Sequence, residues 1–255
     1  MSKSFAVPEA LRKFFQNNPR VAIAFSGGTD SAYLLYAAKQ CRCEVHAYYV
    51  YSQFQPRFER EDAEKLAEEL EIPIKILKTD VLSIPEIAEN PEDRCYFCKQ
   101  VLFRKIIQAA QEDGFPVLCD GTNATDDPGD RPGMRALREL SVRSPLLECG
   151  IGKPQVRELS RRAGLFTWNK PAYACLATRI AAGTEIKASL LKKVERAEQA
   201  LAEMGFSDFR VRVFHGAARI QLPKAQFALA FEKWQEIQEL LCPDFSGVLL
   251  DLNAR

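Results

Sequence analysis

The chain has 255 residues, 47% of them hydrophobic and 27% charged, and its 35 basic and 34 acidic side chains leave a net charge of +1. This composition supports a substantial core and argues against disorder, while the charge balance argues against a nucleic-acid binder that relies on a broad basic surface. The N-terminus lacks an apolar signal core and no apolar run approaches the roughly 20 residues of a membrane span, so we expect a cytoplasmic protein with no membrane segment and a small-molecule substrate.

The most informative stretch follows a short leading helix expected over residues 8–17. An apolar run, Val21–Phe25, predicts a buried strand of a parallel sheet, and it is followed by Ser26-Gly27-Gly28-Thr29-Asp30-Ser31 and then by a helical pattern. Glycines let a backbone turn sharply and bring its N–H groups close to a ligand, and the positive end of the helix dipole points to the same place. The stretch therefore predicts a phosphate-binding turn, with a ligand-free glycine turn as the alternative.

The order Ser-Gly-Gly-x-Asp-Ser resembles the PP-loop of the ATP pyrophosphatase superfamily and lacks the Gly-Lys-Ser/Thr ending of a Walker loop. The resemblance implies cleavage of ATP between its α and β phosphates, with AMP left on a substrate oxygen. It also implies that Ser26, Ser31 and the backbone of Gly27, Gly28 and Thr29 hold pyrophosphate. Asp30 would help to position Mg²⁺.

Strand and helix patterns alternate after the turn. Further strands are predicted over 43–51, 72–77, 115–119 and 140–147, with helices over 56–71, 101–110 and 154–163. Residues 84–93 and 126–135 are expected to be irregular. This order predicts an α/β fold with a Rossmann-like parallel sheet.

Polar residues follow two of these strands at the edge where such sheets bind ligands. Ser52 follows the second strand and should lie near the adenosine, and Asp120-Gly121-Thr122-Asn123 follows the fourth. The latter turn recurs among PP-loop enzymes, which supports a place in the ATP site over a plain surface loop.

Cys95 and Cys98 are three residues apart near the expected start of a helix, so one helical turn would direct both thiols the same way. A helix N-terminus with Arg94 and Lys99 nearby would lower the pKa of both thiols. Metal or cluster ligation is one interpretation; two small core residues or half of a zinc site are the others. Cys175, alone in an aperiodic stretch, by itself favours a buried apolar thiol.

The last quarter of the chain has a different pattern. Helix 187–204, strands 209–215 and 218–222, helix 225–241 and strand 246–252 predict a small α+β domain over residues 181–255, after a PP-loop domain over 1–180. Alternation places Arg210 and Arg212 on one sheet face. Such a pair is usually exposed to solvent, yet the fork geometry of arginine also suits a phosphate.

Together these stretches resemble the LarE family of ATP-dependent sacrificial sulfur transferases, which act in nickel-pincer nucleotide synthesis. The matching stretches span nearly the full length: 24–31, 66–70, 120–122, 130–133, 168–171, 174–179, 210–212 and 218–220. The resemblance implies adenylation of pyridinium-3,5-biscarboxylic acid mononucleotide and conversion of its carboxylates to thiocarboxylates. It adds Gly121, Thr122 and Arg131 to the ATP site.

On the substrate side the resemblance implies roles for Glu198, Arg210 and Arg212. Cys175 would be the catalytic sulfur source, acylated and cleaved at its Cβ–S bond to leave dehydroalanine. Other members have three cysteines that resemble the ligands of a 4Fe-4S cluster. Here these would be Cys95, Cys98 and Cys175, and the sulfide would come from an external source. Sacrificial use of Cys175 is the alternative, and homo-oligomers are expected.

Two rival functions remain at this point. A PP-loop tRNA thiolation enzyme would also combine such a loop with three cysteines, but it needs a basic surface or zinc-ribbon modules that the sequence does not provide. A non-catalytic nucleotide-binding or cluster-binding protein is the other rival. The intact Ser26, Asp30 and Ser31 argue against it.

Overall fold

The computed structural model describes residues 7–126 and 132–255, and the chain divides into two compact units. The first unit consists of Met1–Val81 and Asp93–Lys170, and the second of Leu82–Glu92 and Pro171–Arg255. The second unit therefore begins at Pro171 and takes in a segment from within the N-terminal half, whereas the sequence pattern placed a single boundary after residue 180. Each unit is described by itself below.

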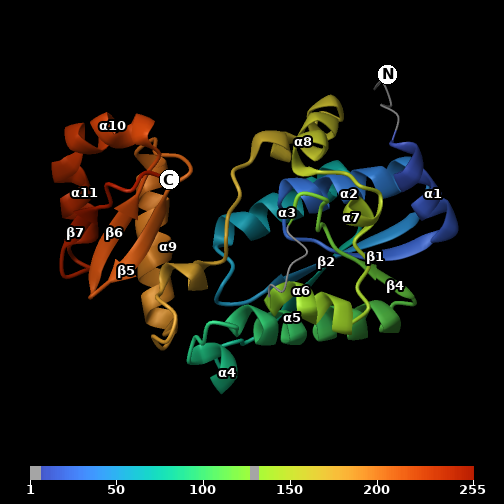
Figure 1. The fold of residues 1–255 in the computed structure, drawn as a ribbon, viewed down its shortest axis with the longest axis horizontal. Helices are drawn as coiled ribbons and strands as arrows, with labels where there is room; N and C mark the ends of the chain where they lie inside the picture. Colours follow the sequence, from blue (N-terminus) through green and yellow to red (C-terminus); the bar gives the residue numbers. More distant parts are fainter. Residues whose placement is uncertain (1–6, 127–131) are drawn as a thin grey trace. The chain divides into compact units, whose positions relative to one another are not determined.

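A four-stranded parallel sheet forms the centre of the first unit (Figure 1). Its order is β3-β2-β1-β4, with Val21 of β1 opposite Val45 of β2 on one side and Val117 of β4 on the other. The strands are β1 (Arg20–Ala24), β2 (Glu44–Tyr51), β3 (Ile74–Lys78) and β4 (Val117–Cys119). The predicted α/β class with a parallel sheet is confirmed.

Helices cover both faces of this sheet and give it two cores. One core joins the sheet to apolar side chains of α1, α2, α3 and α8, and the other joins it to α5. Each buried aliphatic side chain contributes about 1.5–3 kcal/mol, which explains why the strands read as continuous apolar runs. The helices of this unit are α1 (Glu9–Asn17), α2 (Thr29–Gln40), α3 (Arg57–Glu69), α5 (Arg94–Glu112), α6 (Pro132–Glu139), α7 (Pro145–Glu148), α8 (Lys153–Arg162) and the 3₁₀ helix η1 (Phe166–Asn169).

Two predictions in this unit are wrong. The strand expected over 140–147 is reduced to one bridge between Cys119 and Arg143, because Pro145 begins the short helix α7 two residues later. Proline has no N–H for a ladder and its φ suits the first turn of a helix. The long loop expected over 126–135 is also wrong, because α6 begins at Pro132, again with a proline in its first turn. Residues 127–131, which include Arg131, lie outside the described residues.

The second unit is the predicted small α+β arrangement. Its sheet has the order β5-β6-β7, with β5 antiparallel and β7 parallel to β6. The single helix expected over 225–241 is interrupted at Lys233, which caps both halves with φ −101° and ψ 17°. The elements are α4 (Pro85–Ala88), η2 (Leu176–Arg179), α9 (Ala188–Glu203), β5 (Arg210–Phe214), β6 (Ala217–Gln221), η3 (Lys224–Gln226), α10 (Phe227–Glu232), α11 (Trp234–Leu241) and β7 (Val248–Leu250).

The segment Leu82–Glu92 belongs to the second unit through hydrogen bonds. The side chain of Asn90 donates to the carbonyl of Ala181 at 2.7 Å, and the N–H of Ile186 donates to the carbonyl of Ala88 at 2.7 Å. Within the same segment the structure forms the helical turn α4, where the sequence pattern predicted an irregular stretch. Residues that precede the α5 cysteines in sequence are thereby tied to the C-terminal part of the chain.

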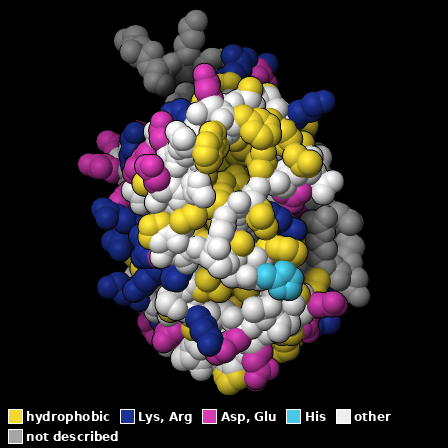
Figure 2. Space-filling model, turned by 90° about the vertical axis from the view of Figure 1, so that its left-hand side faces the viewer, with side chains coloured by type: hydrophobic (Ala, Val, Ile, Leu, Met, Phe, Trp, Pro, Cys, Tyr) yellow, Lys and Arg dark blue, Asp and Glu magenta, His cyan; other side chains and the backbone are white. Residues whose placement is uncertain are grey.

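Apolar side chains are exposed on the second unit (Figure 2). The large ones are Phe214, Phe231, Trp234, Leu240, Leu249 and Leu252. Exposed apolar groups in such number mark contact surfaces, and the homo-oligomer expected from the sequence stays a prediction.

Of the helices that the structure describes, none combines the length and the apolar character needed to cross a lipid bilayer.

Candidate functional site

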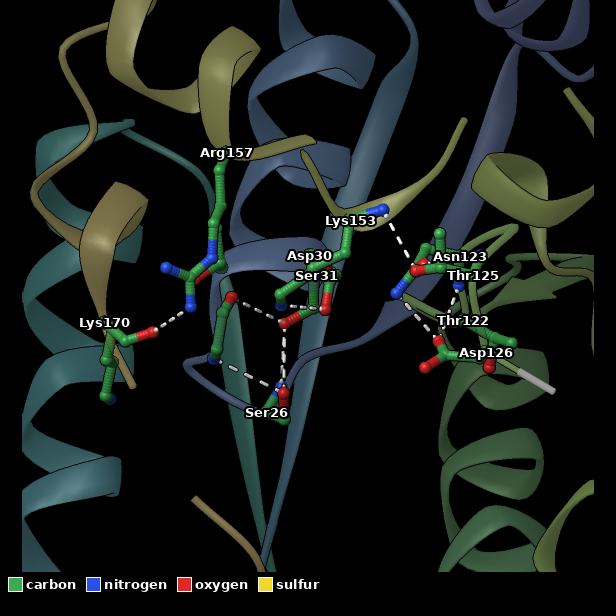
Figure 3. A network of polar contacts seen from close by, with 12 residues as sticks. Ser26, Asp30, Ser31, Thr122, Asn123, Thr125, Asp126, Lys153, Arg157 and Lys170 are labelled. Atoms are coloured by element: carbon green, nitrogen blue, oxygen red, sulfur yellow. Dashed lines mark hydrogen bonds and ion pairs between the residues drawn. The ribbon is translucent and has the colours of Figure 1, made fainter. Parts of the chain in front are cut away.

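The glycine turn joins β1 to α2, as the sequence predicted (Figure 3). Gly27 has φ +72°, and a Cβ atom there would lie 2.9 Å from the carbonyl oxygen of Glu59, so both backbone conformation and space require glycine. Gly28 caps α2, whose first residue is Thr29. The turn therefore directs the start of a twelve-residue helix, with its unpaired N–H groups, over the carboxyl edge of the sheet.

The two serines of the turn hold its shape. Their hydroxyl oxygens lie 3.1 Å apart, and the backbone N–H groups of Ser26 and Gly28 donate to the hydroxyls of Ser31 and Ser26 at 3.3 and 3.4 Å. Thr29 is turned away, because its hydroxyl donates to the carbonyl of Thr167 at 2.8 Å and its side chain is buried. The two serine side chains therefore make hydrogen bonds within the turn, and the side chain of Thr29 attaches the turn to Thr167.

The Asp120-Gly121-Thr122 turn after β4 packs directly against the glycine turn. A Cβ atom on Gly121 would lie 2.8 Å from the backbone nitrogen of Ser31. Asp120 is buried and accepts hydrogen bonds from the hydroxyls of Ser144 at 2.6 Å and Thr122 at 2.5 Å. The two predicted ATP-site segments are therefore neighbours, and a carboxylate fixes the second one.

Replacing Gly121 with alanine is expected to push the two turns apart. Overpacking of this kind costs about 1–3 kcal/mol, and the displaced Ser31 should also raise the KM for ATP. Chemical denaturation and pyrophosphate release measure the two effects. Gly247→Ala is the matched control, because a Cβ atom there meets nothing within 4 Å. Equal stability of the two variants would contradict the close approach.

Asp30 presents an unsatisfied carboxylate oxygen to the site. Its Oδ2 accepts a hydrogen bond from Lys153 Nζ at 2.6 Å, whereas its buried Oδ1 has no hydrogen-bond partner among the described residues. Burial raises the pKa of Asp30 above its ordinary value, although Lys153 opposes the shift. A carboxylate oxygen left open beside a phosphate-binding turn has the donor chemistry that Mg²⁺ prefers, so Asp30 fits its expected role.

Three cations that the sequence pattern did not predict for this site surround the turn (Figure 3). Lys153 begins α8 and reaches Asp30, and Lys170 Nζ donates to the carbonyl of Gly27 at 3.2 Å and to Asp62 at 2.7 Å. Arg157 donates to the carbonyl of Lys170 at 3.3 Å. Positive groups therefore gather where a triphosphate would need them. In the sequence, Lys153 and Lys170 each precede a proline and Lys170 lies in the matching stretch 168–171, but no period connects the three residues.

A small hydrogen-bonded network holds Lys153 in place. Thr125 Oγ1 donates to Asn123 Oδ1 at 2.6 Å and accepts from the backbone N–H of Lys153 at 3.2 Å, while Asn123 Nδ2 donates to Asp126 at 2.8 Å. Asn123 and its neighbours thus position a cation. Ser52 directly follows β2, which is parallel to β1, so it lies at the same edge of the sheet as the glycine turn. It is buried and donates to Gln55 Oε1 at 2.7 Å.

Cys95 and Cys98 lie near the start of α5, which begins seven residues before the predicted helix start at Val101. Cys95 is exposed and Cys98 is half-buried. All eight cysteines are among the described residues and none forms a disulfide. Within residues 7–126 and 132–255, no group of three or more His, Cys, Asp or Glu side chains is arranged to hold a metal ion. Paired thiols in one helical turn have the donor chemistry of two cluster ligands.

The second unit holds the remaining predicted residues. Cys175 caps η2 and is half-buried, Glu198 is buried on α9, and Arg210 and Arg212 lie on β5. Burial, with the nearby charge of Arg179, lowers the pKa of Arg210 to about 10 and also lowers that of Arg212. These arginines thus form a cluster of positive charges, and a bound anion would reduce the repulsion between them.

The four-stranded parallel sheet, the Ser-Gly-Gly-x-Asp-Ser turn before α2 and the open Asp30 oxygen define a PP-loop ATP pyrophosphatase. The family model of the queuosine biosynthesis protein QueC matches residues 20–90, which contain this turn. ATP and Mg²⁺ are the cofactors that the class implies.

Known relatives extend this assignment along the chain. The pyridinium-3,5-bisthiocarboxylic acid mononucleotide synthase of Lactiplantibacillus plantarum is 34% identical over 92% of this chain and 86% of its own. An uncharacterized protein of Synechocystis, slr1717, is 38% identical over 86% of this chain and 82% of its own. A tRNA-specific 2-thiouridylase of Clostridium botulinum, MnmA 2, is 28% identical over only 59% of this chain and 52% of its own. The chain belongs to the family of the first of these, the LarE family.

Proposed function

We propose that the protein is an ATP-dependent sulfur transferase that adenylates the carboxylates of pyridinium-3,5-biscarboxylic acid mononucleotide and converts them to thiocarboxylates. The observation that carries the proposal is the open Oδ1 of Asp30 beside the glycine turn, in a chain related over most of its length to a bisthiocarboxylate synthase. A carboxylate oxygen is a poor leaving group. Attack by that oxygen on the α phosphate of ATP would make it part of AMP, which leaves readily.

Different residues of the first unit would have different roles in the adenylation step. The backbone N–H groups of the turn and the hydroxyls of Ser26 and Ser31 would hold the β and γ phosphates. Lys153 and Lys170, which now neutralise Asp30 and Asp62, are within reach of the same region and would offset charge on the departing pyrophosphate. Bound through Asp30, Mg²⁺ would act as a Lewis acid on the phosphate oxygens.

The second unit would recognise the mononucleotide. Arg210 and Arg212 have guanidinium groups that suit bidentate hydrogen bonds to a phosphate, and their lowered pKa values reflect burial and neighbouring positive charge that a phosphate would compensate. The ring of Tyr173 lies 5.2 Å from the Arg210 guanidinium carbon, which gives the cluster one aromatic face. That the bound mononucleotide carries a pyridinium ring is part of the proposal.

Sulfur would come from Cys175, either directly or through a 4Fe-4S cluster held by Cys95, Cys98 and Cys175. In the direct route the Cys175 thiolate displaces AMP and forms a thioester. Loss of the Cα proton and cleavage of the Cβ–S bond then leave the thiocarboxylate on the substrate and dehydroalanine in the chain. In the second route the cluster would supply an external sulfide and spare the cysteine.

Iron analysis separates the two routes. Anaerobically purified protein is expected to contain iron and acid-labile sulfide, and Cys95→Ala should lose both together with its colour, because two thiolates hold a cluster poorly. Cys242→Ser, at an exposed cysteine of the second unit, is the matched control and should keep them. An iron-free wild-type protein with full activity would reject the cluster and leave the sacrificial route.

The proposed function itself is tested by the substrate that triggers ATP cleavage. Pyrophosphate should form from Mg-ATP only when the pyridinium biscarboxylate mononucleotide is present, and mass spectrometry should show the substrate gain sulfur in place of oxygen. The resemblance to a tRNA-specific 2-thiouridylase makes unmodified tRNA the proper comparison. Pyrophosphate release triggered by tRNA and not by the mononucleotide would replace the proposal with tRNA thiolation. Nucleotide binding without any cleavage would favour a non-catalytic role.

A further inference from the structure

The Glu198 carboxylate is already fully engaged inside the second unit. It accepts hydrogen bonds from Arg179 Nε at 2.7 Å and Nη2 at 3.0 Å, from Tyr173 at 2.5 Å and from the backbone N–H of Val211 at 2.9 Å. A carboxylate has about four acceptor positions. The side chains of Arg179 and Glu198 are 0% and 6% exposed, so a ligand would have to displace a buried ion pair to reach this carboxylate.

The bonds of Arg179 lead from Glu198 to the cysteine loop. Its Nη1 donates to the carbonyl of Ala174 at 3.0 Å and to Thr178 Oγ1 at 2.8 Å. Thr178 in turn donates through its hydroxyl at 2.9 Å and its backbone N–H at 3.0 Å to the carbonyl of Cys175. Residues on both sides of the cysteine are therefore attached to one buried carboxylate.

We infer that Glu198 is a positioning residue, which acts through Arg179 and Tyr173 to hold the loop of Cys175 and does not contact the substrate. The inference deepens the proposed function and rests on it for the role of Cys175. It revises the expectation that Glu198 lies on the substrate side with Arg210 and Arg212. Those two arginines make their described hydrogen bonds to the carbonyls of Ala172, Thr178 and Phe209 and to Gln221, and none to Glu198.

Three substitutions weaken this arrangement by different amounts. Glu198→Gln keeps the shape but loses the charge and half of the acceptors, and Arg179→Lys keeps the charge but loses the fork that spans Glu198 and Ala174. Tyr173→Phe removes the hydroxyl that donates to Glu198 and keeps the aromatic ring, so it is the mildest of the three changes. Glu203→Gln, at an exposed glutamate of the same helix, is the matched control.

The first measurement needs neither ATP nor substrate. Alkylation of Cys175 by iodoacetamide is followed by peptide mass spectrometry and normalised to the exposed Cys242. Glu198→Gln and Arg179→Lys should each raise the normalised rate about tenfold, because loss of the pair populates open conformations of the loop. Tyr173→Phe should raise it less, and Glu203→Gln not at all. The double variant should resemble the single ones, since both act through one pair.

The second measurement is the split between kcat and KM for thiolation of the mononucleotide. The inference predicts a lower kcat at a KM within about twofold of wild type, because positioning of the sulfur and not binding is lost. A raised KM with unchanged Cys175 alkylation would overturn it and return Glu198 to the substrate site. If the wild-type protein does not thiolate the mononucleotide, the proposed function fails, while the alkylation rates still decide the role of Glu198.

Discussion

Replacing Asp30 with asparagine is expected to lower pyrophosphate release from Mg-ATP at least about a hundredfold, the effect of removing one group that stabilises developing charge. Asparagine keeps the shape of the side chain but lacks the charge that would attract Mg²⁺ to the open Oδ1 position. The Mg²⁺ concentration for half-maximal rate should rise as well, which a titration at fixed ATP measures. Retention of the normal rate would exclude Asp30 from metal positioning.

The Asp30→Asn protein should nevertheless be as stable as wild type at neutral pH. Burial raises the pKa of Asp30, which means that the folded state disfavours its charged form even beside Lys153. For a carboxylate with a raised folded-state pKa, deprotonation lowers the stability of the fold as the pH increases, so removal of the charge offsets the lost ion pair. Asp80→Asn, at an exposed aspartate of the same unit, is the control for both activity and melting. A collapse in stability would instead assign Asp30 a structural role.

Replacing Cys175 with serine is expected to abolish thiocarboxylate formation while ATP cleavage in the first turnover persists. A serine hydroxyl is not ionised near neutral pH and carries no sulfur, and it is also a poor iron ligand, so both sulfur routes fail. Single-turnover pyrophosphate release and mass spectrometry of the substrate measure the two steps separately. The residues proposed for adenylation lie in the first unit and Cys175 lies in the second, which is why the two steps should separate.

The control for this experiment is Cys242→Ser, which changes an exposed thiol of the same unit and should leave both steps intact. Thiolation at the wild-type rate by the Cys175→Ser protein would disprove the assigned role. Loss of pyrophosphate release as well would show that the loop of Cys175 is needed before sulfur transfer.

The central sheet and the glycine turn were predictable because each depends on local pattern. A run such as Val21–Phe25 is buried on both faces of a parallel strand, and Gly27 is needed for a left-handed backbone conformation, so both leave a direct trace in the sequence. The strand expected over 140–147 was wrong because its apolar content is satisfied by burial of Leu146 in a helical turn that starts at Pro145. Apolar content alone does not distinguish the two.

The cations around the turn could not be predicted in the same way. Lys153 and Lys170 come from separate segments, and their partners Asp30 and Asp62 are 123 and 108 residues distant in sequence. No periodicity connects such pairs, and a lysine at a helix start or before a proline is ordinarily a solvated surface residue. The contacts of Glu198 with Arg179 and Tyr173 could not be predicted for a related reason, since only the fold brings these side chains together.

The hydroxyls of Ser26 and Ser31 accept hydrogen bonds from backbone N–H groups of their own turn. Hydrogen bonds within the chain thus hold the turn, and a phosphate oxygen would take over acceptor positions that serine oxygens occupy. Binding should then require little loss of chain entropy. Amide hydrogen exchange over residues 26–31 should be slow in the empty protein and change only modestly when ATP is added.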